Sequence, residues 1–286
     1  MNQEAALAWD QHAPAYARLF EPLTGFIARA MLHMVESRLP PKAALLDIAC
    51  GSGALAVPAV RRALRERAAT GVCGTIVATD FSAKMVELTR QAAAALGANE
   101  EIIRCEVHNG EALGLADATF DAVFSSFGIF LFNDRCAGWR EAARVLRPGG
   151  TFVTSVWKGP QHNPMLREQL GPIMAALPPH LVPPSKGGWL EIREPEALIA
   201  EVTSSAPFTN ARCYPFHATI AIGNWREFWD AMRDNPVIGG LLRRCSQTEL
   251  AAVYASVSQR LRELAGGDDE PLLLESVCNI LVATRR

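Results

Sequence analysis

The chain has 286 residues, of which 49% are hydrophobic and 20% are charged, and its formal net charge is -2. This length can bury a full α/β core with additional elements. The nearly balanced charge argues against nucleic acid or an acidic membrane as the partner. The seven cysteines include no Cys-x-x-Cys pair, which predicts a reduced, cytoplasmic protein without a metal site.

The N-terminus begins with polar residues, so it is not typical of a signal peptide. The sequence also contains no apolar run of about 18 residues, and we therefore expect no membrane span.

The first half of the chain alternates between helices and short apolar strands, which indicates a mostly parallel sheet. Residues 3–38 are expected to form helices that stop before Pro40 and Pro41. The pattern then predicts strands near 44–49, 74–80, 102–108, 120–126 and 150–157, and connecting helices near 54–68, 82–97 and 135–147.

The second half adds elements to this pattern. Residues 158–190 contain seven prolines, so we expect no regular structure there. A helix should start at Pro195, and strands near 210–221 and 273–284 should form an antiparallel end of the sheet. Residues 224–265 form a predicted helical insert that, together with the Pro-rich segment, could cover the crevice at the strand ends.

The ends of the first two strands carry the most specific chemical pattern. Residues 45–53 (LLDIACGSG) run from an apolar strand through Asp47 into a Gly51-x-Gly53 turn. Glycine accepts positive φ and has no Cβ, so a ligand can approach the backbone of this turn. Asp80 ends the next strand, where a carboxylate can accept hydrogen bonds from two ribose hydroxyls. The pair predicts a nucleoside-binding crevice.

A nicotinamide dinucleotide is one alternative ligand, because residues 51–56 satisfy the looser form of the dinucleotide fingerprint. Asp47 argues against it, because a carboxylate four residues before Gly51 would repel a pyrophosphate. The same charge suits a cofactor that carries an ammonium group. Asp80 also lies further beyond Gly53 than the roughly 20 positions of the dinucleotide unit.

Three later segments point to a family: residues 109–113 (NGEAL), 116–121 (ADATFD) and 143–150 (ARVLRPGG). With the first turn and Asp80 in the same order, they resemble the class I S-adenosylmethionine-dependent methyltransferases, in the branch that includes the ubiquinone/menaquinone C-methyltransferases. The resemblance covers residues 9–157 well. It implies an α/β, Rossmann-like, doubly wound and mostly parallel seven-stranded sheet, and S-adenosyl-L-methionine as the cofactor.

The resemblance also implies a division of the chain. Residues 1–41 would be an N-terminal helical lid and residues 42–158 the cofactor-binding core. Residues 159–286 would complete the sheet, with the Pro-rich loop at 159–190 and a helical cap at 224–266.

The resemblance assigns a cofactor-binding role to residues at each strand exit and to one lid residue. These are Tyr16, Asp47, Ala49, Gly51, Gly53, Asp80, Phe81, Met85, Asn109, Gly110, Glu111 and Ser126. Asp47 would steer the amino group, Asp80 would bind the ribose, and Phe81 and Met85 would enclose the adenine. Asn109 stands where this branch usually has aspartate.

Structural alternatives apply to three of these residues. Asp47 could merely cap the turn, and Met85 could be ordinary core packing. Asn109 with Gly110 could form only a turn after the strand.

The exit of the fourth strand bears on the acceptor. It reads Ser125-Ser126-Phe127-Gly128, without the Asn/Asp-Pro-Pro-aromatic run of methylases that act on DNA amines or glutamine side chains. No Pro-Cys dipeptide is present for cytosine C5 methylation. We therefore predict a small-molecule acceptor that receives the methyl group by in-line displacement. The apolar residues 130–132 and the aromatic stripe that includes Trp225 and Trp229 suggest that this acceptor is apolar or aromatic.

Candidate acceptor-binding residues are His12, Phe127, Phe130, His162, Trp225 and Trp229. Either histidine could instead be a solvated loop residue, and the Trp225 and Trp229 stripe could be core. No residue is assigned as the catalytic base. The alternatives at the level of the whole protein are a nicotinamide-dependent oxidoreductase and a non-catalytic S-adenosylmethionine-binding protein.

Overall fold

The computed structural model describes residues 3–182 and 194–286 and is built around one seven-stranded sheet. The strand order is β3-β2-β1-β4-β5-β7-β6. Strands β1 to β5 run parallel, whereas β7 is antiparallel to both β5 and β6. The strands are β1 (Ala44–Ile48), β2 (Thr75–Asp80), β3 (Ile103–Val107), β4 (Phe120–Ser126), β5 (Leu146–Trp157), β6 (Phe208–Ile222) and β7 (Leu272–Arg285). The predicted doubly wound sheet with an antiparallel end is confirmed.

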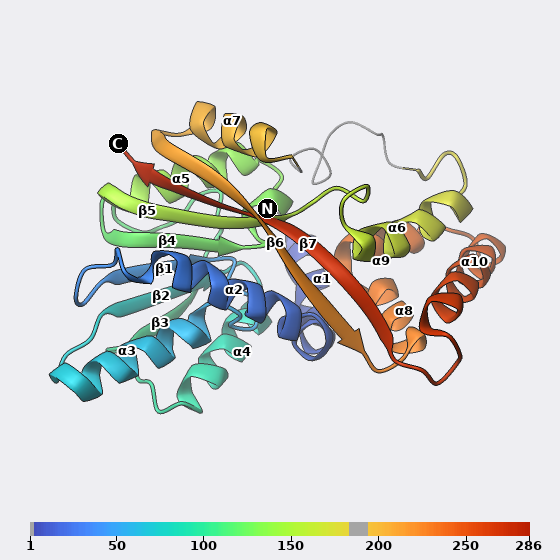
Figure 1. Cartoon of the computed structure of the whole chain (residues 1–286), viewed down its shortest axis with the longest axis horizontal. Coiled ribbons are helices and arrows are strands. Elements are labelled where there is room, and N and C mark those ends of the chain that lie inside the picture. The colour runs from blue at the N-terminus through green and yellow to red at the C-terminus, as the bar shows by residue number, and fades with distance from the viewer. Residues whose placement is uncertain (1–2, 183–193) are drawn as a thin grey trace.

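Helices cover both faces of the sheet (Figure 1). Helices α2 (Glu21–Glu36), α3 (Ala56–Thr70) and α4 (Ala83–Ala94) pack on one face. Helices α5 (Arg135–Val145) and α7 (Pro195–Ser205) pack on the other. The short 3-10 helix η1 (Ile129–Leu131) follows β4.

Local sequence explains where several helices begin. The Ser82 side chain accepts a hydrogen bond from the Met85 amide and so caps α4 directly after the second strand. Asp134 caps α5 in the same way. These caps fix the loops that follow β2 and η1, and both loops lie close to the cavity described below.

Strands β6 and β7 continue beyond the rest of the sheet. Strand β5 pairs with β7 only from Cys278 onward, but β6 pairs with β7 back to Leu272. The resulting two-stranded ribbon leads to helices α8 (Trp225–Asp234), α9 (Pro236–Leu242) and α10 (Gln247–Ala265). Together with α6 (Pro164–Ala176), which packs on α10, these helices form what we call the cap.

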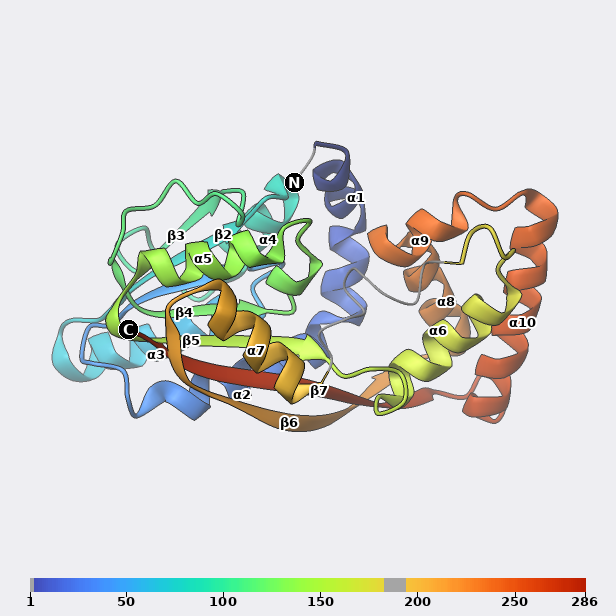
Figure 2. The same cartoon turned by 90° about the horizontal axis from the view of Figure 1, so that it is seen from above.

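The N-terminal helix α1 (Gln3–Leu19) lies between the sheet with its flanking helices and the cap (Figure 2). It contacts α4 on one side and α8 and α9 on the other. The predicted N-terminal helices and the predicted helical insert are therefore both present.

One prediction about regular structure was wrong. Residues 158–190 were expected to lack it, yet α6 occupies part of this segment. Pro164 is tolerated because it stands in the first turn, directly after Asn163, whose side chain caps the helix through the Leu166 amide. Residues 183–190 of this segment, including Gly187 and Gly188, lie outside the described residues.

Within the described part of the chain, no helix is both long and apolar enough to cross a membrane.

Candidate functional site

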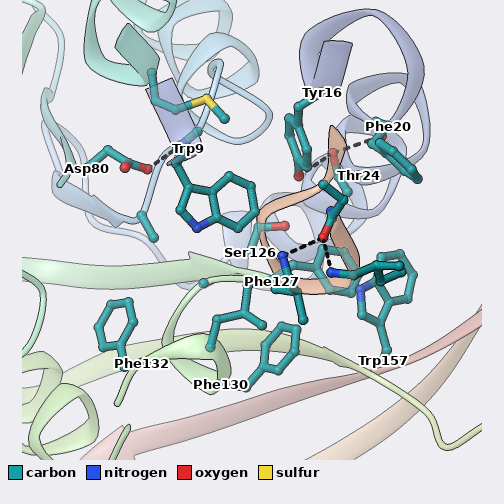
Figure 3. Close-up of a pocket in the computed structure, with 18 of the residues that line it drawn as sticks. Trp9, Tyr16, Phe20, Thr24, Asp80, Ser126, Phe127, Phe130, Phe132 and Trp157 are labelled. Atoms are coloured by element: carbon teal, nitrogen blue, oxygen red, sulfur yellow. Dashed lines mark hydrogen bonds between the residues drawn. The ribbon is translucent and has the colours of Figure 1, made fainter. Parts of the chain in front are cut away.

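A cavity opens at the carboxyl ends of β1, β2, β4 and β5, and α1, α6 and the turn between α8 and α9 close it. Its lining includes eight aromatic side chains. Figure 3 shows Trp9, Tyr16 and Phe20 along one wall, with Phe130, Phe132 and Trp157 opposite. Among the described lining residues, Asp80 is the one with a carboxylate, and none carries a basic side chain. The cavity is therefore mostly apolar, with a carboxylate at one end.

The turn after β1 forms one end of this cavity. Ala49, Gly51 and Gly53 all adopt positive φ, of 58°, 56° and 108°. At Gly53 a Cβ would approach the Val57 side chain to 3.0 Å, so the turn is tight as well as left-handed. Ala49 has a side chain in a conformation that usually favours glycine, which makes it a strained position in the site.

Asp80 is held by backbone amides. One carboxylate oxygen accepts a hydrogen bond from the Gly51 amide at 3.0 Å, and the other accepts one from the Ser82 amide at 2.9 Å. Burial raises the pKa of Asp80 to about 6, although these amides act in the opposite direction. A carboxylate has about four acceptor positions, so Asp80 can still accept a hydrogen bond from a ligand in the cavity.

Asp47 lies behind the same turn and is only 1% exposed. Neither of its carboxylate oxygens accepts a hydrogen bond of ordinary geometry from the described residues. Burial, and then the neighbouring Asp80, raise the pKa of Asp47 well above its usual range, and the nearby Ala56 amide offsets this only in part. A buried carboxylate without a partner is costly, so the site fits a ligand that supplies a cation.

The loop after β4 approaches the turn after β1 closely. A Cβ on Gly128 would lie 2.5 Å from the Ala49 Cβ, so glycine is required at this position. Its neighbour Phe127 adopts φ of 55°, and its ring stacks on Trp157 with centroids 3.8 Å apart. Ser126, Phe127 and Phe130 all line the cavity, as predicted for the exit of this strand.

Comparison with known proteins agrees with this geometry. Residues 46–154 match the model of the methyltransferase domain family. This match to a methyltransferase domain agrees with the resemblance of the sequence to the class I S-adenosylmethionine-dependent methyltransferases. The cofactor of this domain class is S-adenosylmethionine. Its ammonium group suits the buried Asp47, which has no hydrogen-bond partner among the described residues, and its ribose hydroxyls suit Asp80.

Two curated relatives and one solved structure illustrate the similarity. The chain is 32% identical to nocamycin O-methyltransferase of Saccharothrix syringae, over 69% of this chain and 61% of the relative. It is also 32% identical to the ubiquinone/menaquinone biosynthesis C-methyltransferase of Geotalea daltonii, over 54% of this chain and 63% of the relative. The similarity thus spans less than two thirds of either relative. The YcgJ protein from Bacillus subtilis shares the fold, with a TM-score of 0.54, 17% identity, and coverage of 90% of this chain and 98% of that one.

Helix α1 is hydrogen-bonded to the start of α4. Asp10 accepts hydrogen bonds from the Ser82 hydroxyl at 2.5 Å and from the Lys84 amide at 3.0 Å, next to Asp80. Tyr16 lines the cavity and donates its hydroxyl proton to Thr24 at 3.4 Å, and burial raises the pKa of Tyr16 to about 12.

Asn109, Gly110 and Glu111, in the loop after β3, lie outside the cavity lining. The Asn109 side-chain oxygen accepts a hydrogen bond from the Glu111 amide at 3.1 Å, which is the turn that the structural alternative predicts. Gly110 packs against Phe132, where a Cβ would come within 2.5 Å of the ring. A contact from Asn109, Gly110 or Glu111 to adenine remains a prediction.

Among the other residues predicted to bind the cofactor, Tyr16, Ala49, Gly51, Asp80, Phe81, Met85 and Ser126 are brought together in the lining. Asp47 precedes the turn after β1, in that strand, and Gly53 belongs to the turn, but neither lines the cavity. Met85 is also 2% exposed, so it packs in the core and lines the cavity at once.

The two candidate histidines do not line the cavity. His12 is 1% exposed, and its ring lies about 6 Å from those of Trp9 and Tyr16, behind the wall that they form. Neither ring nitrogen of His12 has a hydrogen-bond partner among the described residues. His162 is an exposed side chain 3.9 Å from Glu194.

The placement expected for Trp225 and Trp229 was wrong. Both are buried and pack against Tyr254 of α10, and the Trp225 indole donates a hydrogen bond to Asp268. Their helical spacing therefore marks the interior of the cap, as the structural alternative predicted.

The cap side of the cavity comes instead from residues that sequence reasoning did not select, namely Met165, Leu166, Asn235, Val237 and Ile238. Thr24, Gly128 and Trp157 were also missed. Trp9 and Phe20 were not selected either. They stand seven residues before and four residues after Tyr16, and this helical spacing could have identified them.

Proposed function

We propose that this protein binds S-adenosylmethionine and transfers its methyl group to an apolar or aromatic small molecule by in-line displacement. The observation that carries the proposal is the continuity of the cavity. One lining runs from Asp80 and the turn after β1 to the aromatic residues after β4 and β5. Such a cavity can hold two reagents in contact and away from bulk water.

The cofactor residues would divide the ligand among them. Asp47 would face the ammonium group, which supplies the cation that this buried carboxylate lacks. Asp80 would accept hydrogen bonds from the ribose, and Phe81 and Met85 would enclose the adenine. Bound S-adenosylmethionine supplies an activated methyl group on a sulfonium.

The protein's own contribution is positioning and the exclusion of water. Holding an acceptor in line with the methyl group can contribute about 7–11 kcal/mol to lowering the barrier. Ser126, Phe127 and Phe130 stand where that alignment would be made. The apolar walls replace water around the reacting charges. Among the described lining residues, none is a histidine or a lysine, and we assign no catalytic base.

We also propose that the protein works in a reducing compartment, which agrees with a cytoplasmic location. All seven cysteines are free, and Cys50 and Cys278 are buried. Oxidising surroundings would expose the other thiols to modification.

Thermal unfolding with S-adenosylmethionine, S-adenosylhomocysteine or NADH tests the cofactor. A ligand at 100 times its dissociation constant adds about 2.7 kcal/mol to the free energy of unfolding, which raises the midpoint by several degrees. We expect this rise with both sulfur compounds, its loss in Asp80→Ala, and its retention in Asp269→Ala, which changes a fully exposed carboxylate.

A rise with NADH alone would make the chain an oxidoreductase. The transfer itself is tested by incubating the protein with S-adenosylmethionine and a panel of phenols, thiols and amines. Release of S-adenosylhomocysteine that depends on the acceptor supports the proposal. Cofactor binding without transfer to any apolar acceptor would favour the non-catalytic alternative.

A further inference from the structure

We propose that Phe127 and Trp157 determine acceptor specificity, by stacking on a planar ring and discriminating against a saturated one. The inference rests on the proposed function and deepens it. It starts from the backbone of Phe127, whose φ of 55° is rare for a large side chain. Strain of this kind costs free energy, and it persists where the surrounding structure holds it.

The surroundings of Phe127 do hold it. Its amide donates a hydrogen bond to the Ser155 hydroxyl at 3.1 Å, and two residues later the Ile129 amide donates to the Ser125 hydroxyl at 3.1 Å. Gly128 between them fits against Ala49 because it has no Cβ. Both sides of the turn are therefore fixed, and the position of the Phe127 ring follows from them.

The Phe127 ring lines the cavity as well as packing in the core. It lies nearly parallel to Trp157, with an interplanar angle of 19° and centroids 3.8 Å apart, and both residues line the cavity. Trp157 is the last residue of β5, so the pair stands at the strand exits beside Ser126 (Figure 3). A stacked pair offers a flat surface to a third ring.

The facing wall has the same character. Tyr16 of α1 and Phe20, which directly follows this helix, are also stacked, with an interplanar angle of 29° and centroids 6.0 Å apart. Asp80 at the cofactor end would repel carboxylates and phosphates, and no described lining residue would attract them. The compartment therefore suits an uncharged planar ring between two aromatic surfaces.

The test compares two bicyclic probes of similar apolar size. With the protein saturated with S-adenosylhomocysteine, the affinities of 2-naphthol and decahydro-2-naphthol are measured by calorimetry. We expect the planar probe to bind about tenfold more tightly, since stacking adds to burial. Equal affinities in the unmodified protein would overturn the inference, whatever any variant does.

Two variants locate the effect. Phe127→Leu keeps an apolar side chain but removes the ring, and we expect it to abolish the preference for 2-naphthol while binding S-adenosylhomocysteine as before. The matched control is Phe26→Leu, because the Phe26 ring packs on Phe216, away from the cavity. An undiminished preference in Phe127→Leu would overturn the inference. Failure of S-adenosylhomocysteine itself to bind the unmodified protein would instead overturn the proposed function.

Discussion

Asp47 and Asp80 lie at the same crevice, but their carboxylates differ in hydrogen bonding. Asp80 has two backbone amides as partners, and Asp47 has no hydrogen bond of ordinary geometry from the described residues. Burial raises the pKa of both carboxyl groups above the unfolded value. Burial of the ionised Asp47 without a partner therefore destabilises the folded protein, and a ligand that brings a cation would offset this cost.

We predict that Asp47→Asn makes the protein more stable and weakens its binding of S-adenosylhomocysteine. Since the folded pKa is raised, wild type loses stability as the pH rises above about 4, where the unfolded chain ionises. The advantage of the variant should therefore grow from about pH 4 upward, to about 1–3 kcal/mol. Urea unfolding of both proteins below about pH 4 and at neutral pH measures this difference in stability.

Asp121→Asn is the contrasting control, because Asp121 is paired with Arg147 and accepts the Ala44 amide at 2.7 Å. That variant should be less stable than wild type. A destabilised Asp47→Asn would contradict the account given for Asp47.

For His12 we predict the opposite dependence of folding stability on pH. Burial lowers the pKa of His12 to about 4, against the smaller opposing effect of Asp234. The unfolded chain then binds a proton first, so wild type loses stability as the pH falls from about 6.5 to about 4. His12→Phe should gain stability relative to wild type across this window, by up to about 3 kcal/mol. Unfolding of His33→Gln, which changes an exposed ring, should track wild type.

At the scale of elements, the Asp10 carboxylate ties α1 to the start of α4, beside the crevice. Asp10 accepts two hydrogen bonds from the start of α4, at Ser82 and Lys84. We predict that Asp10→Ala frees α1, so that its amides exchange hydrogen faster and S-adenosylhomocysteine binds about tenfold more weakly. Glu4→Ala changes an exposed acid on the same helix and should alter neither measurement. Unchanged exchange in α1 would contradict this role for Asp10.

The contact between the loops after β1 and β4 depends on Gly128. An alanine there would place a Cβ 2.5 Å from Ala49 and 2.7 Å from the Ser125 hydroxyl. We predict that Gly128→Ala lowers the free energy of unfolding by about 1–3 kcal/mol and impairs cofactor binding. In Gly171→Ala the new Cβ meets nothing within 4 Å inside α6, and the variant should gain about 1 kcal/mol. Equal effects of the two substitutions would be inconsistent with a close approach at Gly128.

The sequence was sufficient for elements whose signals are local. Alternating apolar strands ending at Asp80 and Ser126 predicted the sheet, because strand exits at one edge must meet. The α6 helix was missed because the density of prolines concealed the cap at Asn163 and the favourable first-turn place of Pro164. Trp225 and Trp229 were misplaced because helical spacing identifies a buried face without saying what covers it. Val237 and Ile238 reach the cavity through tertiary packing alone, and nothing local marks them.

At the scale of the whole molecule, the cap touches the rest mainly through α1 and the β6–β7 ribbon. Ligand binding in the crevice should therefore be felt unequally. We predict that S-adenosylhomocysteine slows hydrogen exchange in α1 and in the turn after β1, and leaves the C-terminal half of α10 unchanged. Protection that extends evenly through α10 would show that the cap responds as one rigid part of the core.

The ribbon has a consequence for how such a protein can diversify. Residues 49–85 supply one end of the cavity, whereas residues 157–166 and 235–238 supply much of the far wall. Under the proposed function, separate stretches of sequence would therefore bind the cofactor and the acceptor. Exchange of the helical insert between β6 and β7 would replace part of the far wall and leave the turn after β1 intact. In such a fold, the acceptor specificity could change during evolution while cofactor binding stays the same.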